Sequence, residues 1–418
     1  MIKHILKQIW AQRVANSLLW VELFLVSIFL WFIVDYVYVA TDIYYTPTGF
    51  NLEHTYQVSM DQLLPESSDY VDPDNKKTTL GEDYLTVINR IRTYPGVEAV
   101  ALSKVGIPYA TGNMFNNFAH DTANVSMQCR NVTPDYFRVF KVTTPDGKTE
   151  PLVSGLKNEQ SCVISKDSEE RLMSGKGSAN GIMLTASDSS KIKVVGVSSY
   201  IRYSEFQKKK PCIFIKLSEA DIAKINTPDN FNSIEITFRV SPGTDHDFIT
   251  RFRKDMNRQL KVNNLFMIDI KPMSKVRDTF FLATGDFNEL KVRLAVVVFL
   301  LINIFLGIIG TFWFRTAYRK GEMGLRLVIG STRTNLRGLL VAEALLLLTL
   351  AAIPAAVICF NIGHAELVDI NRMDFTYMRF FMAMAATYLL MAVMIVFGIW
   401  YPARQAMKIQ PAEVLHEQ

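Results

Sequence analysis

The sequence predicts a membrane protein in which four transmembrane α-helices carry a large α+β extracytoplasmic domain, inserted between helices 1 and 2. Each of four apolar runs is about as long as a helix must be to cross a bilayer. The segment between the first two runs loses this apolar character, and short strand-like and helix-like patterns alternate in it. A short basic loop separates the second run from the third, and such loops stay on the cytoplasmic side.

These observations divide the chain into nine predicted segments, with both termini in the cytoplasm. In chain order they are a cytoplasmic amphipathic helix (1–16), transmembrane helix 1 (17–40), the extracytoplasmic domain with its stalk (41–290), transmembrane helix 2 (291–314), a cytoplasmic loop (315–337), transmembrane helix 3 (338–360), a short outer loop (361–379), transmembrane helix 4 (380–401) and a cytoplasmic tail (402–418).

Composition fits a few membrane helices attached to a sizeable soluble domain. Hydrophobic residues make up 49% of the 418 residues, which is too low for a transporter with many spans. The net charge is +5, and much of the basic excess lies beside the apolar runs. This distribution indicates topology determinants and argues against a nucleic-acid-binding surface.

Residues 1–16 are predicted to form a basic amphipathic helix in the plane of the membrane interface. Its apolar residues recur with helical spacing, and Lys3, Lys7 and Arg13 lie opposite them. The alternative is an ordinary positively charged flank that orients the first span, and either interpretation places this end in the cytoplasm. The apolar run that follows is too long for a cleavable signal peptide and shows no small-residue cleavage site.

Two carboxylates lie in the first predicted span, Glu22 near its inner end and Asp35 near its outer end. A carboxylate in a membrane helix is a functional candidate by default. Both lie within about two turns of an interface, where hydration costs little. This position favours a contact at the interface or between helices over a proton relay.

The extracytoplasmic domain contains two helices with a clear apolar face. The first buries Leu80, Tyr84, Val87, Ile88 and Ile91 and is stopped by Pro95-Gly96; the second, at about 245–260, buries Phe248, Phe252, Met256 and Leu260. Strands are expected at 97–102, 161–164, 192–197, 212–217, 234–240 and 266–270.

The end of this domain is expected to form a stalk helix that is continuous with the second span. Residues 274–290 are amphipathic and run into the second span, with Gly285 as the one strong breaker. Three of the four cysteines lie in the domain, in apolar surroundings where buried free thiols are expected, so no disulfide is predicted.

The loop at 315–337 holds six Arg or Lys residues against the single acid Glu322. Apolar residues at helical spacing predict a short amphipathic helix in it, broken at Gly330-Ser331. Such a helix on the inner face of a membrane is suited to binding a soluble partner. The outer loop at 361–379 has no positive excess, in agreement with the opposite location.

Glu343 is the charge within the spans that the sequence singles out most strongly, about one turn beyond the loop. Its structural interpretation is an ion pair with a loop arginine such as Arg337 or Arg333. Its functional interpretation is an anchor, so that a push on the loop moves the span. The two have similar weight and are compatible.

The loop and the third span resemble those of MacB/FtsX-type ABC transporter permeases. The positions that carry this likeness are Arg319, Glu322, Gly324, Arg326, Gly330, Ser331 and Glu343. The tail is similar to the closing pattern of the family, at Pro402, Ala403, Lys408, Pro411, Ala412, Glu413 and Leu415. Segments of the outer domain, such as "NVTPDYFRVF" and "SCVISKDSEERLM", resemble the MacB-like periplasmic core. The resemblance covers nearly the whole chain.

This resemblance implies a permease subunit in the cell inner membrane that transmits motion from separate cytoplasmic ATPase subunits to its periplasmic domain. The relatives serve efflux, lipoprotein or envelope export, or cell-wall regulation. It also implies a second permease copy, as a homodimer or heterodimer, and a periplasmic partner or substrate. ATP and Mg would be bound by the partner ATPase, because neither Gly147-Lys148-Thr149 nor Gly175-Lys176 completes a P-loop.

The residues suggest no catalytic site, no metal site and no cofactor bound by this chain. The histidines are scattered without a zinc-binding spacing. The alternative to a permease is a membrane-anchored extracytoplasmic receptor or scaffold without energy coupling. The shortness of the inner segments disfavours it, and loss of ATPase binding on loop substitution would discriminate the two.

Overall fold

The computed structural model describes residues 10–11, 13–72, 75–110, 112–158, 160–225 and 234–406. The chain forms two compact units, one of Met1–Tyr44 with Asn288–Gln418 and one of Tyr45–Phe287. Most of the expected amphipathic helix at 1–16 and residues 407–418 of the tail lie outside the described residues.

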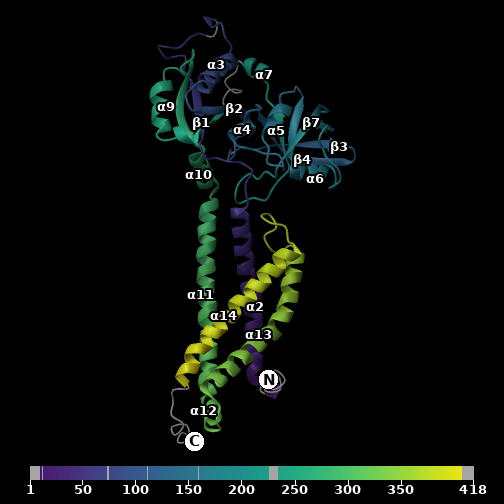
Figure 1. Cartoon of the computed structure of the whole chain (residues 1–418), viewed down its shortest axis with the longest axis vertical. Helices are drawn as coiled ribbons and strands as arrows, with labels where there is room; N and C mark the ends of the chain where they lie inside the picture. The colour runs from purple at the N-terminus through teal and green to yellow at the C-terminus, as the bar shows by residue number, and fades with distance from the viewer. Residues whose placement is uncertain are drawn as a thin grey trace. The chain divides into compact units, whose positions relative to one another are not determined.

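The helical unit contains the four predicted spans. Four helices are long and apolar enough to cross a membrane, which confirms the predicted number. They are α2 (Arg13–Tyr45), α11 (Asp286–Tyr318), α13 (Arg333–His364) and α14 (Tyr377–Ala406) (Figure 1). The short helix α12 (Lys320–Val328) lies between α11 and α13 along the chain, where the sequence predicts an amphipathic helix.

Helix α13 begins where its sequence dictates. Thr332 is its N-cap, and the Thr332 hydroxyl accepts a hydrogen bond from the Asn335 amide. Pro354 lies inside the helix.

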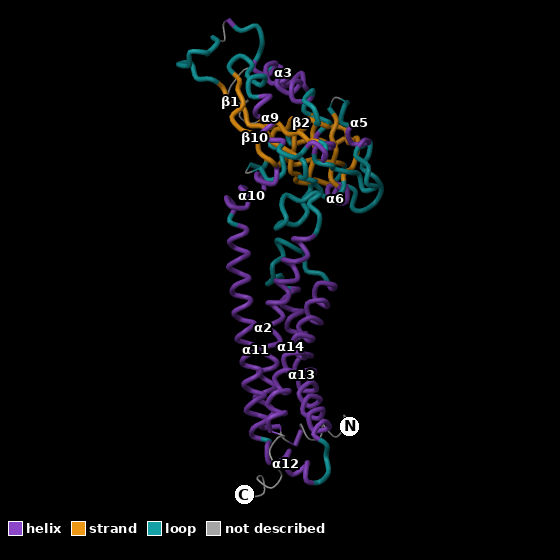
Figure 2. Tube along the Cα trace, turned by 60° about the vertical axis from the view of Figure 1, so that its left-hand side comes forward, coloured by secondary structure: helices purple, strands orange, loops and turns teal. Residues whose placement is uncertain are grey.

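Helices α13 and α14 lie side by side in both views (Figures 1 and 2). The buried core of the unit takes apolar side chains from all four long helices, such as Leu30, Ile308, Leu348 and Ile395.

The second unit is an α+β domain built on one ten-stranded sheet (orange in Figure 2). Its strands are β1 (Thr55–Gln62), β2 (Val97–Lys104), β3 (Met114–His120), β4 (Ala123–Val132), β5 (Ser161–Ser165), β6 (Met183–Ala186), β7 (Lys191–Ser198), β8 (Cys212–Lys216), β9 (Ile234–Val240) and β10 (Leu265–Pro272). Its helices are α3 (Leu80–Arg92), α4 (Tyr136–Val139), α5 (Glu150–Gly155), α6 (Lys166–Leu172), α7 (Glu219–Ala223), η2 (Pro242–Thr244), α9 (Phe248–Met256) and α10 (Met273–Thr284).

The strand order is β10-β1-β9-β2-β4-β3-β6-β7-β5-β8. A further parallel pairing of β4 with β8 joins the last strand back to the fifth, so the second half of the sheet closes into a ring. Every strand of the ring contributes to one apolar cluster, which includes Phe118, Met127, Ile164, Leu184 and Val194. This part of the domain is therefore a small barrel with a filled interior.

The open half of the sheet packs against α3 and α9. A capping box at Thr79 and Glu82 starts α3. The predicted apolar face of α3 is buried in full, and so are the four residues predicted for the second helix. Both sequence-based assignments are confirmed. All four cysteines are free and buried.

The expected continuous stalk helix is interrupted at Gly285. Helix α10 ends at Thr284, and Gly285 adopts the left-handed conformation (φ 75°) as its C-cap. Helix α11 begins one residue later, at Asp286. Glycine takes this conformation at little steric cost, so its backbone freedom outweighs the amphipathic pattern that predicts continuity.

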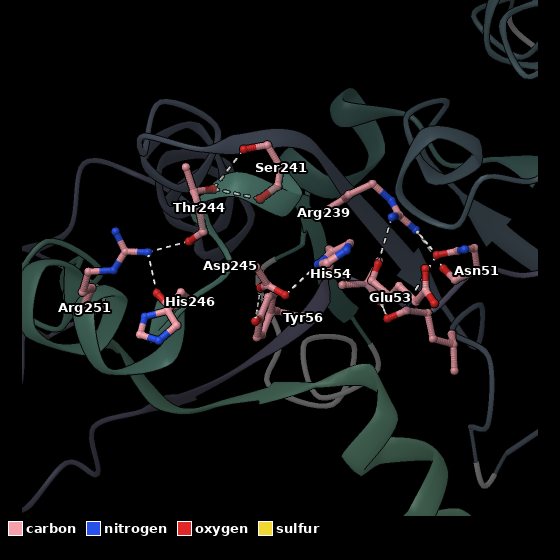
Figure 3. A network of polar contacts seen from close by, with 12 residues as sticks. Asn51, Glu53, His54, Tyr56, Arg239, Ser241, Thr244, Asp245, His246 and Arg251 are labelled. Carbon is pink, nitrogen blue, oxygen red and sulfur yellow. Dashed lines mark hydrogen bonds and ion pairs between the residues drawn. The ribbon is translucent and has the colours of Figure 1, made fainter.

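Arginine 239 on β9 holds the segment that follows α2 along the chain (Figure 3). Its side chain is buried, and its guanidinium donates to the backbone oxygens of Asn51, Glu53 and Val139 at 2.6 to 2.9 Å. Burial lowers the pKa of Arg239. Beside it, Asp245 accepts hydrogen bonds from His54 and Tyr56.

We expect Arg239→Lys to lower the free energy of unfolding by about 1 to 3 kcal/mol. A lysine ammonium cannot reach all these carbonyls at once and leaves buried acceptors unpaired. Thermal unfolding of the full-length protein in detergent measures the loss. Arg258→Lys, a change at an exposed position on the same domain, is the matched control. Equal midpoints for the two variants would contradict the role assigned to Arg239.

Candidate coupling site

A chain of charged side chains joins the end of α11, helix α12 and the first half of α13. It runs Arg315, Glu343, Arg319, Glu322 and Arg326, with an ion pair between each neighbouring two. Three arginines and two glutamates alternate in it, so each carboxylate lies between two guanidinium groups. The chain of ion pairs connects the short loop helix to both spans that flank it.

Glu343 is the centre of this arrangement and is almost completely buried, with 3% of its side chain exposed. Arg315 Nη2 donates to its Oε1 at 2.7 Å, and Arg319 Nη1 donates to its Oε2 at 2.7 Å. Arg315 Nη2 also donates to Asn16 Oδ1 of α2 at 2.6 Å. One buried carboxylate thus connects residues of α2, α11 and α13.

The sequence predicts an ion pair between Glu343 and a loop arginine. The two arginines that it names as examples, Arg337 and Arg333, are not the partners in the structure. Arg337 precedes Glu343 by six residues on the same helix, so the two side chains point to different faces. Arg333 lies about 15 Å away along the helix axis. The actual partners are Arg315 near the end of α11 and Arg319, the N-cap residue of α12.

Glu322 joins α12 to the same network. It accepts two hydrogen bonds from Arg319, at 2.9 and 3.2 Å, and one from Arg326 at 2.7 Å. The hydrogen bonds from Arg319 lower the pKa of Glu322 below its usual range. Burial lowers the pKa of Arg319, but its bonds to Glu322 and Glu343 outweigh burial and raise it overall. Both groups are therefore held in their charged forms.

The other predicted loop residues shape the turn after α12. Gly324 lies within α12 and is half-buried. Gly330 has φ 102°, a conformation that favours glycine, and its amide donates to the Leu327 oxygen. Ser331 is exposed, and its amide donates to the Arg326 oxygen. Gly330 and Ser331 thus close the C-terminus of α12, whereas Arg319, Glu322 and Arg326 form the ion pairs.

Glu22 of α2 lies apart from this network. Both of its carboxylate oxygens accept from the Thr311 hydroxyl of α11, at 2.9 and 3.0 Å. The contact joins two helices, in agreement with the structural role that the sequence favours for this residue. Asn16 and Arg315 are the members of the site that sequence reasoning missed. The signal was present in Arg315, the first basic residue after the second apolar run.

A second buried ion pair lies at the opposite end of the helical unit. Arg379 of α14 donates to both carboxylate oxygens of Asp35 in α2, at 2.8 and 2.6 Å. Arg379 also donates to the backbone oxygens of Asp369 and Met373 in the α13–α14 loop. Asp35 therefore connects two spans, as its interpretation as a helix–helix contact predicts.

Among the described residues, no three His, Cys, Asp or Glu side chains form a group that could hold a metal ion. The arrangement at the site consists of ion pairs between guanidinium and carboxylate groups. Such an arrangement can hold helices together and transmit a displacement from one to another.

Two families match this chain. The FtsX-like permease C-terminal family matches residues 294–411, and the MacB-like periplasmic core domain matches residues 42–251. No curated protein matches.

Solved structures of extracytoplasmic domains are also similar. The extracellular domain of the noncanonical ABC-type transporter YknZ from Gram-positive bacteria is 14% identical, with a TM-score of 0.30, and the match covers 51% of this chain and 100% of that one. The periplasmic region of MacB from Actinobacillus actinomycetemcomitans is 11% identical, with a TM-score of 0.31, and the match covers 57% of this chain and 97% of that one.

The family matches place the MacB-like domain between the first and second candidate spans and the FtsX-like region over the other three. This order confirms both the predicted resemblance and the predicted fold class. The protein is a multi-pass membrane protein with an extracellular domain. The chain belongs to the FtsX-like permeases with a MacB-like periplasmic core domain, which are permeases of ABC transporters.

Proposed function

We propose that this chain transmits ATP-driven motion from a separate cytoplasmic ATPase to its extracytoplasmic domain. The observation that carries the proposal is the chain of ion pairs from α12 to Glu343. A partner that displaces α12 also displaces Glu322 and Arg319, and through them the buried carboxylate on α13. Packed helices joined by buried charges move together because the alternative leaves a charge unpaired.

The orientation belongs to the same proposal. The basic excess at 315–337 supports an orientation with α12 and both termini in the cytoplasm and the α+β domain in the periplasm. The membrane is then the cell inner membrane. ATP and Mg are bound by the partner ATPase, and this chain contributes no catalytic residue to hydrolysis.

The assembly that we propose contains two permease copies, identical or similar, and two ATPase subunits. The exposed apolar side chains of Leu325 on α12 and of Ile329, its C-cap residue, are available to a soluble partner. The work done on the outer domain serves efflux, envelope export or cell-wall regulation. A receptor or scaffold without energy coupling is the competing class.

The test co-purifies the full-length chain with its ATPase and measures ATP hydrolysis. We expect Glu322→Gln and Gly330→Ala each to lower the permease-dependent hydrolysis about fivefold or more, which is the range of coupling energies between sites. The first removes the ion pairs of α12, and the second strains the turn at its end. Glu366→Gln in the α13–α14 loop is the control.

The two classes give different results. If the loop variants bind the ATPase and hydrolyse ATP as the unsubstituted chain does, the coupling proposal fails and the scaffold class is favoured. Cysteine accessibility provides the second measurement. Labelling of Ser331→Cys from the same side as the α+β domain would also contradict the proposal, because it would reverse the orientation of α12.

A further inference from the structure

A cavity of about 1080 Å³ lies between α2 and α11, at the end of the helical unit nearest α12. Its wall is mostly apolar, and Leu18, Phe314 and Tyr318 on its wall are each more than three-quarters exposed. Such side chains on a membrane span are covered by lipid chains or by another protein chain. The cavity is therefore open to the membrane, and its occupant has an apolar part.

One polar group of this cavity has too few partners for its charge. The Glu22 carboxylate accepts hydrogen bonds from a single donor, the Thr311 hydroxyl. Among the described residues, no basic side chain forms an ion pair with it. The two arginines on the cavity wall are engaged elsewhere, since Arg315 and Arg319 both bind Glu343.

A carboxylate with one hydroxyl partner in a mostly apolar wall keeps unused acceptor capacity, and a cationic N–H donor is the partner that satisfies it best. Glu22 is six residues from Asn16, or about 9 Å along the helix. This depth, close to the end of the span, is where the headgroups of a membrane leaflet meet its acyl chains. A lipid whose headgroup carries a primary ammonium group places that cation there and its acyl chains along the exposed apolar wall.

We propose that this cavity binds a membrane lipid with a primary-ammonium headgroup, with Glu22 accepting a charge-assisted hydrogen bond from the ammonium group. The Thr311 hydroxyl orients the carboxylate, and Leu18, Phe314 and Tyr318 contact the acyl chains. Arg315, Arg319 and Glu322 of the ion-pair network also line this cavity, but the headgroup contact that we propose is at Glu22. The site depends on neither an ATPase nor the coupling function, so its failure would leave that proposal standing.

Native mass spectrometry of the detergent-purified, full-length protein tests the site. The protein is equilibrated with an equimolar mixture of phosphatidylethanolamine, phosphatidylcholine and phosphatidylglycerol. We expect preferential retention of phosphatidylethanolamine, because the choline headgroup has a positive charge but no N–H donor, and glycerol has neither. Equal retention of the three lipids, or a preference for either of the others, would overturn the proposal.

Substitutions then assign the preference to the cavity. Glu22→Gln keeps the shape and removes the charge, and we expect the preference for phosphatidylethanolamine to fall about tenfold. Leu18→Trp fills the mouth and lowers retention of all three lipids. Phe29→Trp, at an exposed position of α2 outside the cavity, is the control and leaves retention unchanged. An unchanged preference in Glu22→Gln would overturn the role of the carboxylate.

A second copy of this chain could cover the same cavity, and a cross-link distinguishes that occupant. Leu18→Cys is oxidised in native membranes and the product is separated by mass. We expect no disulfide-linked dimer, because acyl chains fill the mouth of the cavity. Efficient dimer formation through Cys at this position would overturn the lipid site and identify the cavity as an interface between copies. The lipid ranking of the unsubstituted protein needs no variant, so a folding defect cannot mask it.

Discussion

Glu343→Gln is expected to destabilise the helical unit by about 3 to 5 kcal/mol. Among the described residues, the substitution removes the one acid that forms an ion pair with Arg315 and one of two that form ion pairs with Arg319. The Arg315 guanidinium, 18% exposed, then loses its counter-charge, while Arg319 keeps Glu322. An uncompensated, largely buried charge is among the largest single-residue penalties. Thermal unfolding of the full-length protein in detergent, followed through the tryptophans of the spans, measures the loss.

The control is Glu322→Gln in the same network. Glu322 binds Arg319 and Arg326, but a third of its side chain is exposed. Water can therefore hydrate the guanidinium groups after the substitution, and the free energy of unfolding is expected to fall by at most about 1 kcal/mol. Adding Arg315→Gln to Glu343→Gln restores part of the stability, because it removes the unpaired charge. Similar midpoints for Glu343→Gln and Glu322→Gln would show that burial does not determine the energy of this network.

The features that could be predicted from the sequence are those indicated by the spacing and length of local apolar runs. The buried faces of α3 and α9 follow from apolar residues at helical spacing, and the four spans follow from the length of their apolar runs. The loop site was predictable in composition, since Glu322, Gly330 and Glu343 all stand out in the sequence. Each of these signals depends on residues that lie close together along the chain.

Contacts between distant segments were not predictable. Glu343 is paired by Arg315 and Arg319 because the chain around α12 brings the end of α11 close to α13, and the periodicity of α13 alone contains no such information. The same holds for the barrel, which closes through a parallel pairing of β4 with β8. A single sequence does not identify which of its distant strands pair with each other.

At the other end of the helical unit, Asp35→Leu is also expected to lower the free energy of unfolding by about 3 to 5 kcal/mol. Its partner Arg379 has 1% of its side chain exposed and would keep its charge without a carboxylate. The same thermal unfolding measures the effect. Thr41→Val, a change at an exposed hydroxyl of the same helix that bonds only to its own turn, is the control.

The double variant Asp35→Leu with Arg379→Met separates charge from packing. If the penalty in the single variants comes from the unpaired charge, the double variant is more stable than either single one. It still lacks the hydrogen bonds from Arg379 to the Asp369 and Met373 oxygens, so the α13–α14 loop becomes more sensitive to limited proteolysis. Losses that add in the double variant would mean that Asp35 and Arg379 stabilise the unit independently. Non-additive losses with faster loop cleavage instead assign two roles to Arg379: it neutralises Asp35 between two spans, and it holds the loop that connects α13 to α14.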